Sequence, residues 1–297
     1  MLLYLKLIKF DNLLILAFAQ LCIKFGLFSP FGIAITLSNF GIILLVIATI
    51  LIAAAGNIII AIYEQENKGL LHGGITIKSA YRLFVIFNVI GVLIGFYLAN
   101  LVNKPSFAAL FILVSGAFYM YATSLKELLV VKNLVIAILG ALCLIVVGIF
   151  DLLPAITVKN RASQTVIFSI VLDYSIFAFI IIVMREIIKD CLFMNRDHRL
   201  EIKTIPMVLG KERALKWIGI VALVPIIAIL YYVYTYLFSN TLAVIFALFI
   251  LVGPLIYFMI RCFTAESHQH IAILKRLLKL ELIAAAISLL FYQFILI

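Results

Sequence analysis

Apolar runs of about 20 residues recur along the whole chain, and they constrain the fold more than any other feature of the sequence. A helix of about 20 residues is roughly 30 Å long, which matches the hydrocarbon core of a bilayer. The runs lie at residues 10–28, 40–62, 81–101, 106–124, 133–150, 165–188, 215–237, 241–260 and 275–297. The sequence therefore predicts an all-α integral membrane bundle of nine transmembrane helices.

The composition excludes a soluble protein of this length. Hydrophobic residues make up 67% of the 297 residues and charged residues only 12%, so one soluble domain could not bury the apolar surface. Backbone groups cannot stay unpaired in lipid, and the alternating pattern of a barrel strand is absent, so the spans are expected to be helices. We expect one membrane domain over residues 1–297, without a separate soluble module.

Basic residues assign a side of the membrane to each loop. Of the 23 Lys and Arg residues, three fall on one side, Lys24 lies inside the first span, and nineteen fall on the other side. By the positive-inside rule, we expect the N-terminus and the two long loops, residues 63–80 and 189–214, to be cytoplasmic. The same placement explains the net charge of +10, so no nucleic-acid partner is expected. Lys24 is tolerable if it faces the protein interior or reaches a lipid headgroup.

Acidic residues stand where two spans end and the two long loops begin. Glu64 follows the second span, and Asp190 and Asp197 follow the sixth. Both groups are expected on the cytoplasmic side, which favours two facing halves of one site. Carboxylates arranged in this way could hold Mg²⁺, which prefers oxygen ligands and bridges to diphosphate. The alternative is a set of solvated loop charges in local ion pairs, each worth only a few tenths of a kcal/mol.

Further polar residues accompany these acids. Several basic residues near the two span ends could contact phosphate oxygens directly. They are Lys126, Lys189, Arg196, Arg199 and Lys203. Asn57, Glu64 and Lys68 share one helix face by their spacing. Asp173, inside the sixth span, is expected to face the bundle interior, either at a ligand or at a neighbouring helix.

Four segments resemble the UbiA-type intramembrane prenyltransferases. They are "AAAGNIII", "YMYATSLKELLVVKN", "REIIKD" and "KTIPMVLGKERA". The long cytoplasmic loops after the second and sixth of nine spans are also similar, so the resemblance covers essentially the full chain. It implies Mg²⁺-assisted binding of a polyprenyl diphosphate by two Asp-rich motifs, and transfer of the prenyl group to an aromatic, glycerol phosphate or related acceptor. It also implies that Tyr121 and Ser124 lie beside the diphosphate and lower prenyl chain, unless they belong to an interfacial aromatic belt.

The sequence departs from the family at both Asp-rich motifs. The first motif of the family has the form N-D-x-x-D-x-x-x-D, and the ungapped register retains only Glu64 as an acid and has Lys68 at the last position. The second, D-x-x-D-x-x-x-D, retains Asp190 and Asp197 but has Phe193 in the middle. The three surviving acids are the expected catalytic and metal-binding residues; they could hold one Mg²⁺ with phosphate oxygens and water, whereas two ions would be difficult to hold. Lys68 would either replace a missing cation or pair with Glu64 and close the site.

Two functions follow from this reading. The first is a membrane prenyltransferase that uses a polyprenyl diphosphate and a membrane acceptor, with the loops 63–80 and 189–214 capping the site. The alternative is a catalytically degenerate relative that binds an isoprenoid lipid or quinone without turnover. A transporter is disfavoured, because short Gly- or Pro-broken spans are not paired in two halves of the chain.

Overall fold

The fold is almost entirely helical, as the apolar runs predict. A computed structural model describes residues 2–64, 70–71, 74–265 and 267–292. The two described strands, β1 (Leu70–Leu71) and β2 (Ile75–Thr76), form a short antiparallel hairpin in which Leu70 pairs with Thr76. Everything else of regular structure in the described residues is helix, which confirms the all-α class.

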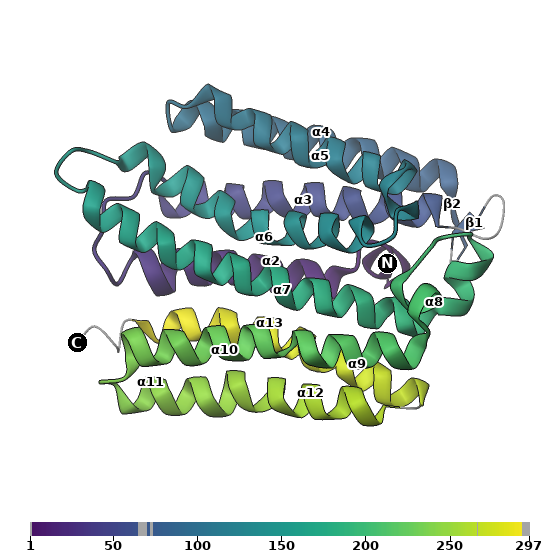
Figure 1. The fold of residues 1–297 in the computed structure, drawn as a ribbon. Coiled ribbons are helices and arrows are strands. Elements are labelled where there is room, and N and C mark those ends of the chain that lie inside the picture. The colour runs from purple at the N-terminus through teal and green to yellow at the C-terminus, as the bar shows by residue number, and fades with distance from the viewer. Residues whose placement is uncertain (1, 65–69, 72–73, 266, 293–297) are drawn as a thin grey trace. The chain divides into compact units, whose positions relative to one another are not determined.

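The helices follow one another with short connections (Figure 1). In chain order they are α1 (Leu2–Leu7), α2 (Phe10–Cys22), η1 (Ile23–Phe28), α3 (Asn39–Tyr63), α4 (Ile77–Leu101), η2 (Pro105–Phe107), α5 (Ala108–Thr123), η3 (Leu125–Glu127), α6 (Val131–Asp151), η4 (Leu153–Ala155), α7 (Arg161–Arg199), α8 (Ile205–Leu209), α9 (Lys211–Val221), α10 (Leu223–Tyr232), η5 (Val233–Leu237), α11 (Thr241–Phe246), η6 (Ala247–Val252), α12 (Gly253–Thr264) and α13 (His268–Leu290). Of the η segments, η1, η5 and η6 are π-helical turns that continue a longer helix.

Eight helical segments among the described residues are long and apolar enough to cross a membrane, and they coincide with the first eight predicted spans. Helix α13 corresponds to the ninth but is not one of the eight. Its sequence places Lys275, Arg276, Lys279 and Glu281 close together, so no long uncharged stretch remains within it. The protein is an integral multi-pass membrane protein, and the count of nine spans is approximate. The cytoplasmic side of the N-terminus and long loops stays a prediction.

Helix α7 is much longer than the predicted span 165–188. It has 39 residues, so residues 189–199, which the sequence analysis assigned to a loop, are helical. The prediction was wrong because Ile187, Ile188 and Cys191 are all buried, and this spacing continues the apolar stripe past the polar residues. The backbone leaves helical geometry only at Phe193, with φ −109° and ψ 18°. From Arg161 to Phe193 the helix is about 50 Å long.

Backbone contacts divide the chain into two compact units. The first unit contains residues 1–126 and 142–172, and the second contains residues 127–141 and 173–297. Helices α6 and α7 each contribute one part to each unit. In the first unit, α3 packs along α4 and also contacts α2 and α5. In the second unit, α12 lies against α9 and α13.

Small residues let the helices of the first unit approach closely. A Cβ atom at Gly95 of α4 would overlap the ring of Phe111 on α5, and one at Gly56 of α3 would overlap the ring of Phe118. Helix pairs in membranes commonly pack through such small residues, because lipid tails give no hydrophobic driving force between helices. These contacts bring α5 against both α3 and α4.

We expect Gly95→Ala to destabilise the first unit. The added methyl group must displace the Phe111 ring, and overpacking of this kind costs about 1–3 kcal/mol, which outweighs a gain of up to about 1 kcal/mol in helix propensity. The measurement is the unfolding midpoint of the purified protein in mixed micelles. Gly116→Ala is the matched control, because nothing lies within 4 Å of its added Cβ, and it should leave the midpoint unchanged or raise it. Equal midpoints for the two variants would contradict the packing described.

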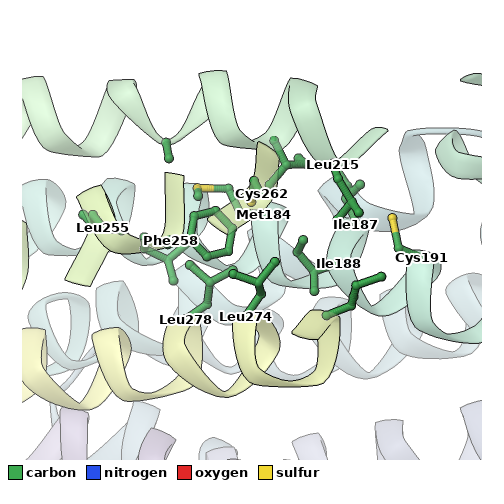
Figure 2. Close-up of a cluster of buried hydrophobic side chains, with 14 of the residues drawn as sticks. Met184, Ile187, Ile188, Cys191, Leu215, Leu255, Phe258, Cys262, Leu274 and Leu278 are labelled. Atoms are coloured by element: carbon green, nitrogen blue, oxygen red, sulfur yellow. The ribbon is translucent and has the colours of Figure 1, made fainter. Parts of the chain in front are cut away.

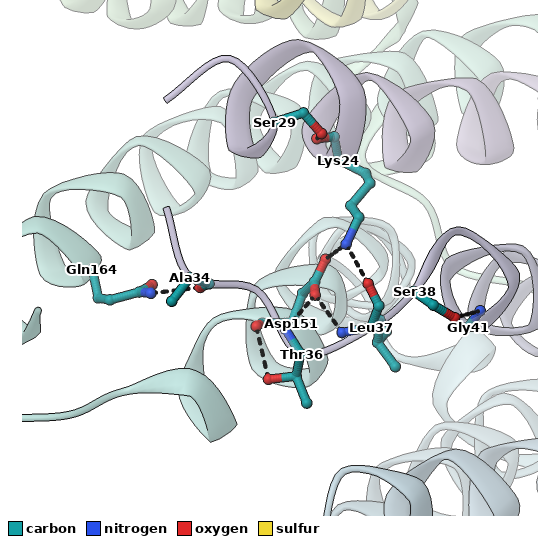
Figure 3. A network of polar contacts seen from close by, with 9 residues as sticks. All are labelled: Lys24, Ser29, Ala34, Thr36, Leu37, Ser38, Gly41, Asp151 and Gln164. Atoms are coloured by element: carbon teal, nitrogen blue, oxygen red, sulfur yellow. Dashed lines mark hydrogen bonds and ion pairs between the residues drawn. The ribbon is translucent and has the colours of Figure 1, made fainter. Parts of the chain in front are cut away.

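Lys24, the charge inside the first predicted span, lies in η1 and is buried, with 1% of its surface exposed. Its Nζ donates to Oδ2 of Asp151 at 2.5 Å and to the Leu37 carbonyl at 2.7 Å (Figure 3). The other carboxylate oxygen of Asp151 accepts from the backbone N–H groups of Thr36 and Leu37, at 3.0 and 2.8 Å. Lys24 therefore faces the protein interior, which confirms one of the two expected environments.

A large apolar cluster forms the core of the second unit (Figure 2). Met184 and Ile188 of α7 meet Leu215 of α9, Phe258 of α12 and Leu274 of α13 there, and all five are almost completely buried. Since these residues lie toward the C-terminal part of α7, the cluster fixes the part of this helix that carries the acidic residues.

Candidate functional site

The central feature of the candidate site is the buried carboxylate of Asp190 on α7. Its Oδ1 accepts a hydrogen bond from Lys132 Nζ at 2.7 Å, and its Oδ2 accepts one from Asn133 Nδ2 at 3.1 Å. Lys132 and Asn133 belong to the first turn of α6. All three residues lie in the second unit and expose at most 7% of their surface. Both oxygens of Asp190 are thus occupied by donors of the protein itself.

Asp197 extends this cluster by two turns of α7. It is 2% exposed, and its Oδ1 accepts from Arg196 Nη2 at 3.0 Å and Nε at 3.2 Å. Its Oδ2 lies 4.0 Å from Lys132 Nζ. One ammonium group is therefore within 4.0 Å of both surviving acids of the second motif. Two carboxylates and two cations, Lys132 and Arg196, make the cluster close to neutral.

The backbone before α6 is arranged to present Lys132 and Asn133. Val130 has φ 54°, in the left-handed region that β-branched residues rarely adopt. Such a conformation costs about 1–3 kcal/mol and persists only where surrounding contacts hold it. The Asn133 N–H donates to the Val130 carbonyl at 3.0 Å, which closes the first turn of the helix. The strained residue thus directly precedes the helical turn from which Lys132 and Asn133 donate to Asp190.

The residues around Asp190 do not fit a magnesium site as they are arranged. Mg²⁺ needs oxygen ligands in near-octahedral geometry, whereas both Asp190 oxygens already accept from nitrogen donors. Within either unit, the described residues include no group of three or more His, Cys, Asp and Glu side chains placed to hold a metal ion. Glu64 lies in the first unit and the two aspartates in the second, so the three-ligand set stays a prediction.

In the first unit, the predicted residues gather around the end of α3. Glu64 is the C-terminal cap of this helix. Lys126 is 7% exposed, its Nζ donates to the carbonyl of Tyr63 at 2.8 Å, and it lies 5.6 Å from the centre of the Tyr63 ring. The structure thus brings Lys126 beside the residue that precedes Glu64. Asn57 has a different contact: its Nδ2 donates to the carbonyl of Ile8 at 2.9 Å.

Tyr121 and Ser124, the two predicted substrate contacts that precede Lys126 in the chain, differ in environment. Tyr121 is 5% exposed within α5, whereas Ser124 caps the end of that helix and is exposed. Ser124 Oγ donates to Thr123 Oγ1 at 3.5 Å. Ser124 is therefore the more accessible of the two predicted substrate contacts in the first unit. Lys68 lies outside the described residues.

In the second unit, the remaining predicted phosphate contacts follow Asp190 along the chain. Lys189 Nζ donates to Glu186 Oε2 at 2.7 Å, so it forms the local ion pair that the alternative reading expected. Arg199 and Lys203 are exposed beyond the end of the buried cluster. Arg196 joins the cluster through Asp197, and its guanidinium group also lies 4.9 Å from the centre of the Phe193 ring.

Lys132 and Asn133 belong to the site but were not predicted from the sequence. Both belong to a segment that carried the family resemblance, but only Lys126 was selected from it. The sequence feature that could have identified them is a charged residue followed by an amide in the first turn of an apolar helix. Polar side chains in such a position need hydrogen-bond partners. Their contacts with Asp190 join residues 57 and 58 positions apart, so spacing within one helix could not reveal them.

A cavity of about 320 Å³ lies within the second unit, beside the first residues of α7 that belong to this unit. Asp173 lines it and is separated from Asp190 by 17 residues, about 25 Å along the helix. Tyr174 shares a 2.6 Å hydrogen bond with Ser288, and Tyr232 shares one of 2.5 Å with Tyr292. The remaining lining is mostly aliphatic and aromatic. Asp173 lines this cavity, but the residue is exposed in the structure, so the expectation that it faces the bundle interior is not met, and a contact with a ligand stays a prediction.

Two π-helical segments, η5 and η6, contribute to the wall of this cavity. π-helical turns cost regular hydrogen bonding and are frequently found at functional sites. The second unit thus has a packed apolar core that includes Cys191, next to Asp190, and a separate cavity with a mostly apolar lining.

Comparison with known proteins places the chain in a family. The sequence model of the UbiA prenyltransferase family matches residues 13–283. A digeranylgeranylglyceryl phosphate synthase from Methanosphaera stadtmanae is 25% identical over 228 residues, which cover 74% of this chain and 75% of that protein.

Solved structures agree with this assignment at the level of the fold. A UbiA homolog from Aeropyrum pernix K1 in its apo form superposes with a TM-score of 0.67 at 13% identity, over 94% of this chain and 95% of that one. A UbiA homolog from Archaeoglobus fulgidus bound to GPP and Mg²⁺ gives 0.56 at 15% identity, over 97% and 99%. With a family match over most of its length, the chain belongs to the UbiA prenyltransferase family.

Proposed function

We propose that the protein is a membrane prenyltransferase that transfers a polyprenyl group from its diphosphate to a lipid acceptor. The observation that carries the proposal is the buried cluster of Lys132, Asn133, Asp190 and Asp197 in a chain of a prenyltransferase family. Burying charged groups is costly unless they are paired and hydrogen-bonded, so a cluster of this kind in an apolar helical bundle marks a functional position.

In the proposed reaction, the protein's cations stabilise the departing diphosphate. The C–O bond between the allylic carbon and the diphosphate breaks, and the electron pair leaves with the diphosphate. A nucleophilic atom of the acceptor then bonds to the allylic carbon and loses its proton. Charge that develops on the leaving oxygens is stabilised by cations fixed in a water-poor site, usually the largest catalytic contribution. Lys132 is the buried cation of the second unit that supports this role.

Other cations are proposed to hold the diphosphate. Lys126, Lys189, Arg196, Arg199 and Lys203 remain the proposed phosphate contacts, with Asn57, Lys68, Tyr121 and Ser124 as further substrate contacts. One Mg²⁺ at Glu64, Asp190 and Asp197 is the expectation from the sequence, and nothing in the structure tests it; the Archaeoglobus fulgidus homolog was solved with Mg²⁺ bound. Because the arrangement around Asp190 does not fit this ion, the reaction above assigns it no step.

The acceptor is proposed from the named relative. The product of digeranylgeranylglyceryl phosphate synthase carries two geranylgeranyl groups on a glyceryl phosphate. A glycerol phosphate lipid is therefore the first acceptor to try, and an aromatic acceptor is the second. The donor to use is geranylgeranyl diphosphate for the same reason.

The test is transfer of the prenyl group from labelled geranylgeranyl diphosphate in membranes that contain the protein. The expected result is a labelled lipid that forms only with a suitable acceptor, either geranylgeranylglyceryl phosphate or 4-hydroxybenzoate. Membranes that lack the protein are the control. Absence of product across both acceptor classes, with and without Mg²⁺, would contradict the proposal.

The cavity beside Asp173 favours a second candidate function, the binding of an isoprenoid lipid or quinone without turnover. Ligand pockets typically have volumes of about 300–1,000 Å³ and combine apolar walls with a few polar groups. The cavity, with its Tyr174–Ser288 and Tyr232–Tyr292 pairs, meets both conditions.

Mass spectrometry of the purified protein tests this second candidate. We expect a co-purifying isoprenoid lipid or quinone, and we expect Ala247→Phe, which fills the cavity from η6, to reduce its occupancy about tenfold or more. Leu280→Phe is the control, because Leu280 is exposed on α13 and does not line the cavity. If Ala247→Phe retains as much bound lipid as the wild type, the lipid binds outside this cavity. If the wild-type protein transfers a prenyl group, the proposal of binding without turnover is wrong.

A further inference from the structure

We propose that the ammonium group of Lys132 takes the place of a divalent cation between Asp190 and Asp197, so that this protein binds a diphosphate without a metal ion at these acids. The inference rests on the proposed function, because it concerns the same donor site. It departs from the sequence-based expectation that these two aspartates hold Mg²⁺.

The ammonium group of Lys132 lies between the two carboxylates. Lys132 Nζ is 2.7 Å from Asp190 Oδ1 and 4.0 Å from Asp197 Oδ2, so a single positive charge is shared by both carboxylates. Its side chain is 8% exposed, and those of Asp190 and Asp197 are 4% and 3% exposed. A cation bound between these acids would have to occupy the space that Lys132 fills.

The charges of the two acids are balanced by neighbouring cations. Asp190 is satisfied by Lys132 and Asn133, and Asp197 is satisfied by Arg196. No uncompensated negative charge is left on the pair to attract a divalent ion. Binding of a metal here would first require the buried ion pair between Lys132 and Asp190 to separate, which leaves a buried ammonium group without its partner.

Lys132 retains hydrogen-bonding capacity beyond its contact with Asp190. An ammonium group has three N–H donors. One is used by Asp190 Oδ1, and the 4.0 Å separation from Asp197 Oδ2 is too long for a good hydrogen bond. At least one donor is therefore available for a phosphate oxygen, as a charge-assisted contact. The first turn of α6 adds the positive end of a helix dipole on the same side.

The first experiment uses the wild-type protein, purified in detergent, and measures Mn²⁺ binding by electron paramagnetic resonance without diphosphate. We expect no stoichiometric Mn²⁺ bound at this pair. In Lys132→Met, the two carboxylates lose their shared cation, and we expect one Mn²⁺ to bind. Lys216→Met is the matched control, because Lys216 pairs with the exposed Glu212 on α9 and should leave Mn²⁺ binding as in the wild type. Stoichiometric Mn²⁺ in the wild-type protein, removed by Asp190→Asn, would overturn the inference.

The second experiment measures the Kd for geranylgeranyl diphosphate with EDTA and with Mg²⁺. For the wild type we expect the two Kd values to agree within about fivefold, because the contacts come from fixed cations. For Lys132→Met we expect a loss of about tenfold or more in EDTA that Mg²⁺ restores, whereas Lys132→Arg should keep metal-independent binding. A wild-type Kd that weakens more than about fivefold in EDTA overturns the inference but leaves the proposed function standing.

The two experiments separate the two claims. If the wild-type protein binds no geranylgeranyl diphosphate under either condition, the proposed function and the diphosphate part of this inference both fail. The Mn²⁺ measurement still decides whether Lys132 excludes a metal from the aspartates. Size-exclusion chromatography of each variant identifies any that fails to fold, and the wild-type measurements need no variant.

Discussion

Asp190→Asn should reduce prenyl transfer by about a hundredfold or more, equivalent to about 2.7 kcal/mol of transition-state stabilisation. The substitution keeps the shape of the side chain and an oxygen for Asn133, but it removes the charge that holds the Lys132 ammonium group 2.7 Å away. Lys132 would then be a buried cation without its carboxylate, free to adopt other rotamers. The measurement is kcat/KM for labelled prenyl transfer in reconstituted membranes.

The control for this prediction is Glu212→Gln on α9. Glu212 forms an ion pair with Lys216, but its side chain is 82% exposed, so its loss should change neither activity nor stability by a measurable amount. The effects of Asp190→Asn on KM and on kcat should also be measured separately. A rise in KM alone would show that Asp190 only helps to bind the donor, and an unchanged kcat/KM would remove the cluster from the mechanism.

Lys24→Met should destabilise the first unit by about 3–5 kcal/mol, because it removes one member of a buried ion pair and leaves the other charged. Asp151 is fully buried, and Lys24 supplies the positive charge that its carboxylate contacts. Two backbone N–H groups would still donate to Asp151, but they carry no net charge. The measurement is the midpoint of SDS-induced unfolding in mixed micelles, where a large decrease is expected.

The double variant Lys24→Met/Asp151→Asn tests the explanation for this decrease. With both charges removed, no buried carboxylate is left without a partner, so the double variant should recover a large part of the lost stability. Replacing a buried ion pair by neutral groups is often close to neutral for stability, whereas breaking it is not. Additive losses from the two single substitutions would show that the pair is not coupled, contrary to Figure 3.

The positions of the helices could be predicted from the sequence because length and hydropathy determine them. Observed helical segments such as Phe10–Phe28 and Asn39–Tyr63 begin and end within a few residues of the predicted spans. The end of α7 could not be predicted in the same way. Polar residues after Ile188 resemble a loop, but Cys191 packs in the apolar core and extends the helix to Arg199.

The acids of the candidate site were found from the sequence, whereas their partners were not. Asp190 and Asp197 were identified by a resemblance and by their place at the end of a span. That Lys132 lies between them depends on how α6 packs against α7, and Val130 reaches the required backbone conformation despite its side chain. Likewise, the sequence showed that Lys24 must avoid the lipid, but it did not identify its partner Asp151, which lies 127 residues away in the chain.

The length of α7 has a consequence for the surrounding lipid. The stretch from Arg161 to Phe193, about 50 Å, exceeds a hydrocarbon thickness of roughly 30 Å, so one end must project from the bilayer or the helix must tilt. Asp190 lies close to the end of this stretch, 29 residues after Arg161. Hydrophobic mismatch would therefore shift this carboxylate relative to the headgroups as acyl chains lengthen or shorten. Bilayer thickness would then set the hydration of the ion pairs between Asp190, Asp197 and Lys132.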